Sequence, residues 1–208
     1  MVEIIDNAIN LAATAFCAIV AAVFMVRTNK RAWVLLMLTG GVYFLGDLYW
    51  QLYLLFYGET PPYSYISDMS WYVATLLMFI LLTEIRAVHG KWYYSHILWI
   101  IPVFTVGMAI FFLQWGDILG NIITVVFRSA LLWNAAGGLL AARKVEEEKP
   151  NRWFYSLALT YCLSEYAMEV ASCFWMGDTI RNPYFWADTL MALAFVAMPW
   201  GLRKAVER

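Results

Sequence analysis

The chain has 208 residues, of which 63% are hydrophobic and only 14% charged, and its formal net charge is −1. Soluble domains average about 45–50% apolar and about 25% charged residues, so this chain has too few polar side chains to cover a soluble domain of its size. Seven membrane helices of about 20 residues each, with short connections, would use nearly all of it. This excludes an appended soluble catalytic domain, a nucleic-acid-binding module and a disordered tail.

Seven apolar segments are long enough to cross a membrane as helices. In chain order they cover residues 5–26, 32–57, 65–85, 93–115, 118–142, 153–176 and 185–202. The connections between them are short and hold most of the charged residues. The sequence therefore predicts an all-α integral membrane protein with seven transmembrane helices in a single domain, residues 1–208.

Basic residues gather on alternate connections, which fixes the expected orientation. Twelve of the 14 basic residues fall on one side: Arg27, Lys30, Arg31, Arg86, Lys91, Arg143, Lys144, Lys149, Arg152, Arg203, Lys204 and Arg208. Connections rich in Lys and Arg stay in the cytoplasm. We therefore expect a multi-pass protein of the cell membrane, with its N-terminus outside and its C-terminus in the cytoplasm.

The first and last thirds of the chain resemble each other. Trp33 matches Trp153 and Asp68 matches Asp188, both at a separation of 120 residues. This pattern predicts a 3+1+3 parallel internal repeat, with repeat 1 over about 5–85, a linker helix over 93–115 and repeat 2 over about 118–202. A binding site is then expected near the repeat interface. The alternative is convergent membrane composition with similar turns.

Four ionisable residues lie within the predicted helices, in the half nearer the outside. They are Asp47, Arg128, Glu165 and Glu169, and the two glutamates share one helix face because they are four residues apart. Charges within a bilayer are costly, so such residues are candidates for function. Arg128 can instead lock the bundle by pairing with one acid. Since one pair cannot neutralise three acids, we predict a ligand-binding site over these four residues.

Aromatic and polar neighbours extend this predicted site. Tyr43, Trp50 and Gln51 lie at −4, +3 and +4 from Asp47 and so share its helix face. Carboxylates beside aromatic rings suit a cationic ligand. Asp68 and Asp188, near the outer ends of their helices, are expected either to cap those helices or to gate the mouth of the site.

Metal and cofactor motifs are missing from the sequence. The sequence has two histidines, His89 and His96, and no cluster of histidine or cysteine residues with metal-ligand spacing. No phosphate-binding loop or nucleophile elbow occurs either. We therefore predict neither a metal site nor a cofactor, and no catalytic residue can be assigned.

Residues 44–82 carry a pattern that resembles the seven-helix membrane regions of bacterial signalling proteins. The matching features are Gly46-Asp47, Trp50, the Pro61-Pro62 turn and Asp68. Such regions often precede diguanylate cyclase or kinase output domains, and none follows Arg208 here. The resemblance implies a sensor that signals through a separate cytoplasmic partner.

Two further resemblances keep other functions open. The 3+1+3 layout is similar to transporters of the SWEET and nicotinamide riboside types, although the PQ dipeptide of the first is missing. Acids in an aromatic-rich bundle resemble membrane-bound meroterpenoid cyclases, whose Trp-Glu-Phe type motif is not reproduced.

The leading hypothesis is a receptor or sensor that binds a small cationic or lipophilic ligand in an outward-facing acidic and aromatic cavity. The alternatives are a proton-coupled small-molecule transporter and an intramembrane enzyme that uses a carboxylic acid as general acid. Membrane lipids are the other expected partners, and the basic cytoplasmic face would attract anionic ones.

Overall fold

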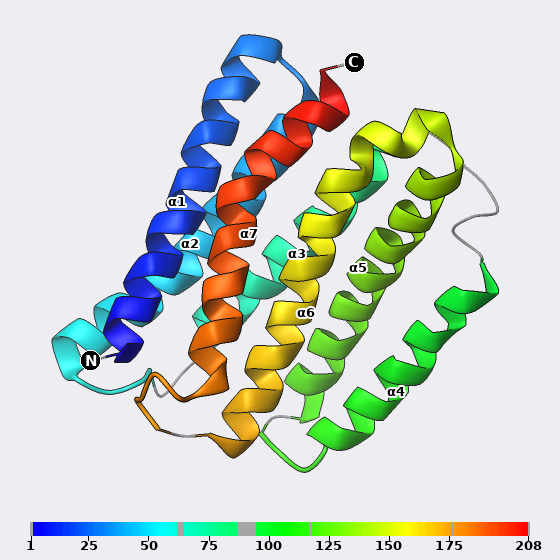
Figure 1. Ribbon diagram of the computed structural model, residues 1–208. Helices are drawn as coiled ribbons and strands as arrows, with labels where there is room; N and C mark the ends of the chain where they lie inside the picture. The colour runs from blue at the N-terminus through cyan, green and yellow to red at the C-terminus, as the bar shows by residue number, and fades with distance from the viewer. Residues whose placement is uncertain (1, 62–64, 87–94, 117, 176, 208) are drawn as a thin grey trace.

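The computed structural model describes residues 2–61, 65–86, 95–116, 118–175 and 177–207. Within these ranges every regular element is helical, and no strand occurs (Figure 1). Several residues named above lie outside the described ranges, namely Pro62, His89, Lys91 and Arg208.

Seven α-helices alternate in direction, so the two ends of the described chain lie at opposite ends of the bundle (Figure 1). They are α1 (Val2–Thr28), α2 (Arg31–Tyr57), α3 (Tyr65–Glu84), α4 (Ile100–Phe112), α5 (Ile118–Lys144), α6 (Arg152–Phe174) and α7 (Pro183–Val206). Two 3₁₀ turns, η2 (His96–Trp99) and η3 (Glu146–Asn151), precede α4 and α6. Helices α1, α2, α3, α5 and α7 are each long and apolar enough to cross a membrane.

The fourth helix is shorter than the predicted segment 93–115. Helix α4 has 13 residues, with Pro102 in its first turn, where a missing backbone N–H is tolerated. It ends before Gly116, which adopts a left-handed φ of 64°. At about 1.5 Å per α-helical residue and about 2.0 Å per 3₁₀ residue, η2 and α4 together extend about 28 Å. That length approaches the hydrocarbon thickness of about 30 Å.

Six helices form a closed ring and α4 lies outside it. Helix α1 packs on α2 and α7, α3 packs on α2 and α5, and α6 packs on α5 and α7. Helix α4 packs mainly on α5, at the edge of the bundle (Figure 1). We call the end of the bundle with the α1–α2 and α5–α6 connections the basic end, and the opposite end the cavity end.

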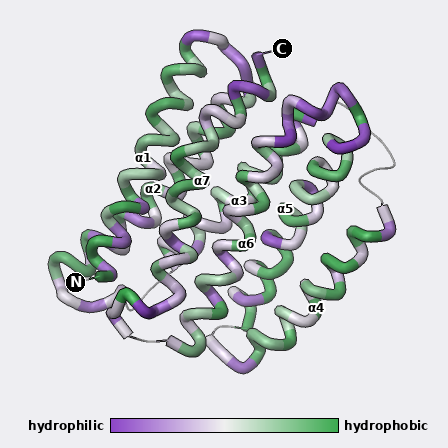
Figure 2. Tube along the Cα trace, in the orientation of Figure 1, coloured by the Kyte–Doolittle hydropathy of each residue, from purple (hydrophilic) through white to green (hydrophobic). Residues whose placement is uncertain are grey.

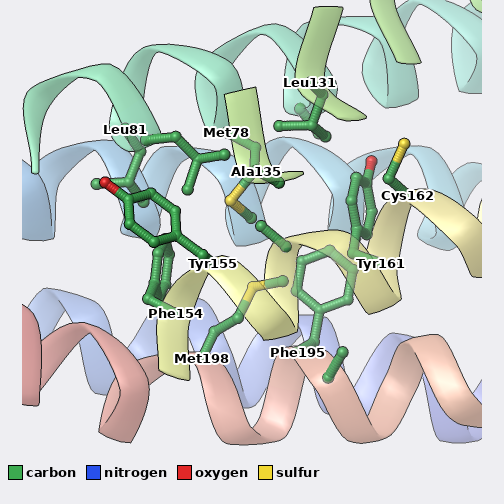
Figure 3. Close-up of a cluster of buried hydrophobic side chains, with 14 of the residues drawn as sticks. Met78, Leu81, Leu131, Ala135, Phe154, Tyr155, Tyr161, Cys162, Phe195 and Met198 are labelled. Carbon is green, nitrogen blue, oxygen red and sulfur yellow. The ribbon is translucent and has the colours of Figure 1, made fainter. Parts of the chain in front are cut away.

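The half of the bundle nearer the basic end is filled by side chains. Met78 and Leu81 of α3 meet Tyr155 of α6 and Met198 of α7 in a buried cluster (Figure 3). Helices α5 and α6 approach closely here, because a Cβ atom on Gly138 would lie 2.4 Å from Cε1 of Tyr155. By contrast, a Cβ atom on Gly41 of α2 would meet nothing within 4 Å.

The outer surface of the bundle is apolar. Large side chains such as Val26, Ile19 and Leu193 are 80%, 64% and 61% exposed. Figure 2 shows hydrophobic residues along most of each helix and hydrophilic stretches at the α1–α2 and α5–α6 connections. Helices of this length, with an apolar outer surface, are compatible with a helical membrane protein.

Candidate ligand-binding site

Arg128 of α5 binds both glutamates of α6. Its Nη2 lies 2.6 Å from Oε2 of Glu165, and its Nη1 donates to Oε2 of Glu169. The arginine and Glu165 are buried, with side chains 13% and 5% exposed. Both terminal nitrogens of the guanidinium are thus engaged by carboxylates of the protein itself.

A tyrosine connects this ion-pair cluster to the floor of the site. The hydroxyl of Tyr43 in α2 donates to Oε1 of Glu165 at 2.6 Å. Its ring lies 5.1 Å from the ring of Phe195 and 6.1 Å from the ring of Tyr161, between centroids. Tyr161 in turn shares a hydrogen bond of 2.9 Å with the hydroxyl of Thr75. These contacts separate the site from the packed core below it.

Asp47 of α2 is buried without a basic partner among the described residues. Nε1 of Trp71 donates to its Oδ1 at 3.1 Å. Thr14 of α1 lies beside it, but the threonine hydroxyl donates to the backbone carbonyl oxygen of Asn10 at 2.9 Å. Oδ2 of Asp47 therefore has no donor within the described part of the chain, although the residue is only 8% exposed.

A second group of buried polar residues joins α1 to α7. Nδ2 of Asn10 donates to Oδ1 of Asp188, and the carboxyl group of Asp6 lies within hydrogen-bonding reach of Asp188. All three residues are 6% exposed or less. Oδ2 of Asp6 and Oδ1 of Asn10 have no hydrogen-bond partner within the described chain. Two carboxyl groups this close need a proton or a cation between them.

Arg128, both glutamates, Asp47, Asn10 and Asp188 all line one cavity of about 930 Å³. It reaches from Arg128 and Glu165 to the α2–α3 and α6–α7 connections at Thr60 and Asp178, so it opens at the cavity end. Every helix of the ring contributes to its wall, and α4 does not. The wall is also rich in aromatic side chains: Tyr43, Trp50, Tyr65, Trp71, Tyr72, Trp175, Tyr184 and Phe185.

The structure brings most of the predicted site residues together. Asp47, Arg128, Glu165, Glu169, Tyr43 and Trp50 all line the cavity. Gln51 does not line it, because its side chain is buried toward α1 and Nε2 donates to the carbonyl oxygen of Ile4 at 3.4 Å.

The two aspartates predicted as caps or gates differ from one another. Asp68 lies in the first turn of α3, where a carboxylate suits the helix dipole, and it lines the cavity. Asp188 does not cap α7, so that part of the prediction is wrong. The N-cap is Asn182, whose side chain accepts from the backbone N–H of Tyr184 at 3.0 Å, and Asp188 lies further along the helix.

Asp6 and Asn10 were missed by the sequence analysis, although a signal for them exists. Glu3, Asp6, Asn7 and Asn10 follow the spacing of one helix face, and Glu3, Asn7 and Asn10 line the cavity. A polar stripe at the beginning of an apolar helix resembles an ordinary solvated helix end. The contact of α1 with α7 is what buries it.

The site carries an excess of acid. Asp6, Asp47, Glu165, Glu169 and Asp188 stand against one guanidinium, a formal charge of −4 if all are ionised. Arg128 is the one basic side chain among the described residues that line the cavity. Within the described ranges, no group of three or more His, Cys, Asp or Glu side chains is arranged to hold a metal ion.

Comparison with family models, with curated proteins and with solved structures found no match for this chain. The chemistry of the site therefore has to be argued from its own residues.

Proposed function

We propose that the chain is a membrane receptor or sensor that binds a small organic cation in the cavity between its helices. The observation that carries this proposal is the excess of buried carboxyl groups over the one guanidinium that lines the cavity. A charge buried in a membrane protein without a partner is costly, so a cation that enters the cavity relieves that cost. Aromatic faces in the wall would add cation–π attraction.

The state of Arg128 argues against an anionic ligand. Its positive charge is already offset by two glutamates, to which both terminal nitrogens donate. A ligand carboxylate or phosphate would therefore approach a cluster with a formal charge of −1 and meet like charge. A cation meets no such obstacle at Asp47 or Asp188.

The orientation proposed from the sequence places the cavity end outside the cell. Arg27, Lys30, Lys149 and Arg203 belong to the basic end, which would face the cytoplasm. The core in Figure 3 closes the bundle on that side. A ligand would therefore enter from outside, and a separate cytoplasmic partner would read the change at the basic end.

A transporter is the second candidate, and the packing of the helices favours it. If α1, α2 and α3 are exchanged with α5, α6 and α7, the pairs α1·α2, α2·α3 and α1·α7 become α5·α6, α6·α7 and α3·α5. All six pairs are in contact. This is the pattern expected of the proposed 3+1+3 parallel repeat, and repeats in transporters rock about a site at their interface.

The test of the proposal is a binding screen on the purified protein in lipid nanodiscs. We expect small organic cations to raise its melting temperature and matched anions and neutral isosteres to leave it unchanged. Asp47→Asn should weaken binding, and Glu59→Gln, which removes an exposed carboxylate of the α2–α3 connection, should not. A protein stabilised by anions and not by cations would contradict the proposal.

Uptake into sealed proteoliposomes separates the two candidate functions. A receptor binds the cation without accumulating it, whereas a transporter carries it across and does so faster when a pH gradient is applied. Flux that is lost in Asp47→Asn and kept in Glu59→Gln would assign the transporter.

A further inference from the structure

The cavity has two places where buried acids have no basic partner among the described residues. One is Asp47 on α2, and the other is Asp188 on α7, which lines the cavity and lies within hydrogen-bonding reach of Asp6 on α1. Arg128 is directed to neither, because it is held by the two glutamates of α6. Asp47 and Asp188 nevertheless line the same cavity. One elongated ligand can therefore reach both.

Both places also present oxygen atoms that lack a hydrogen-bond donor. These are Oδ2 of Asp47, Oδ2 of Asp6 and Oδ1 of Asn10, on residues that are 8%, 6% and 5% exposed. A buried acceptor without a donor is costly, because it has lost its hydrogen bonds to water. A quaternary ammonium group brings charge but no N–H, so it leaves that cost in place. A protonated amine supplies charge and three N–H donors together.

We propose that the ligand is a linear dication with a protonated amine at each end, an aliphatic diamine or polyamine, held between Asp47 and Asp188. This inference rests on the proposed cation-binding function and names its ligand class. One ammonium group donates to Asp47 beside Trp71, and the other donates to Asp188 and Asn10, which also line the cavity. The methylene chain between them lies along aromatic side chains of the wall, such as Trp50 and Tyr184.

The same residues exclude related ligands. An amino acid carries a carboxylate, and the charge of Arg128 is already offset by two glutamates, so that carboxylate would meet like charge. A monoamine satisfies one of the two places and leaves the other acid without a partner. The preference for a dication is thus a preference for filling both places at once.

The experiment is a chain-length series measured by calorimetry on the wild-type protein in nanodiscs. Diamines from 1,3-diaminopropane to 1,8-diaminooctane are compared with the monoamine of each length and with bis-quaternary analogues. Since the second ammonium group adds charge-assisted hydrogen bonds, we expect the best diamine to bind at least about tenfold tighter than its monoamine. We expect one optimal length, and bis-quaternary analogues to bind at least about tenfold weaker.

Two variants assign the ends of the ligand. Asp47→Asn and Asp188→Asn should each reduce the advantage of the diamine to the level of the monoamine, and Glu59→Gln should keep it. Monoamines that bind as tightly as diamines at every length would overturn this inference and leave the proposed cation binding intact. Bis-quaternary analogues that bind as tightly as diamines would also overturn this inference and leave the proposed cation binding intact. If no cation binds, both proposals fail. The length series needs no variant, so misfolding of a variant does not prevent the test.

Discussion

Replacing Arg128 with methionine should destabilise the protein strongly, because it leaves two carboxylates facing each other without a cation. The side chains of Glu165 and Glu169 are 5% and 20% exposed, so Glu165 in particular has little access to water. Removing one partner of a buried ion pair typically costs about 3–5 kcal/mol. For a chain of this length each kcal/mol lowers the melting temperature by about 2–4 °C, so we expect a loss of about 6–20 °C.

The assay is thermal unfolding in detergent followed by size-exclusion chromatography. The triple variant Arg128→Met, Glu165→Gln, Glu169→Gln should recover most of the loss, since it contains no unpaired charge at this point. Arg31→Met is the control, because its pair with Glu84 spans 3.9 Å between side chains that are 73% and 38% exposed. Such pairs contribute about 0–1 kcal/mol. If Arg128→Met costs no more than Arg31→Met, or if the triple variant is as unstable as the single one, the reasoning is refuted.

Three further predictions concern packing and orientation. Gly138→Ala should lower the free energy of unfolding by about 1–3 kcal/mol, because its Cβ would lie 2.4 Å from a tyrosine carbon of α6. Gly41→Ala, whose Cβ would meet nothing within 4 Å, should be neutral or stabilising by about 0.5–1 kcal/mol. Equal effects of the two variants in thermal unfolding would contradict the close approach of α5 and α6. Asn134→Ala should cost about 1–3 kcal/mol, since its buried amide links α5 to α3 through hydrogen bonds at 3.1 and 3.3 Å, and an unchanged melting temperature would disprove the link. In cells, a cysteine introduced by Glu59→Cys should react with an impermeant maleimide, and one introduced by Glu147→Cys should react only after permeabilisation; the opposite pattern would reverse the proposed orientation.

Much of the site could be predicted from the cost of charge in a membrane. Asp47, Arg128, Glu165 and Glu169 stand out in apolar segments, and all four line one cavity. The two readings considered for Arg128, a locking ion pair and a ligand site, turn out to be compatible in geometry. The arginine is locked to both glutamates, and a cavity still reaches it.

What the sequence could not reveal depends on contacts between helices. Asp6 and Asn10 lie in the first turns of an apolar helix, where water normally solvates polar groups, and the packing of α1 on α7 buries them. Gln51 shares the helix face of Asp47 by spacing, yet its side chain is directed to the backbone of α1. Asp188 was expected near a helix end, and α7 begins two residues earlier than predicted, at Pro183, which places Asp188 further inside.

The closed half of the bundle has an electrical consequence. Arg128 lies ten residues from the start of α5, about 15 Å along the axis, so a water-filled cavity would carry the potential of the outer solution about halfway through the membrane. With the cavity end outside as proposed, the membrane voltage would then fall mainly across the packed core of Figure 3. Moving one elementary charge through the full voltage is worth about 2.3 kcal/mol per 100 mV. A small displacement of the charged floor would therefore cross a larger share of that voltage than the same displacement in a solid bundle. Ligand binding and membrane potential would then both act on the charged floor of the cavity.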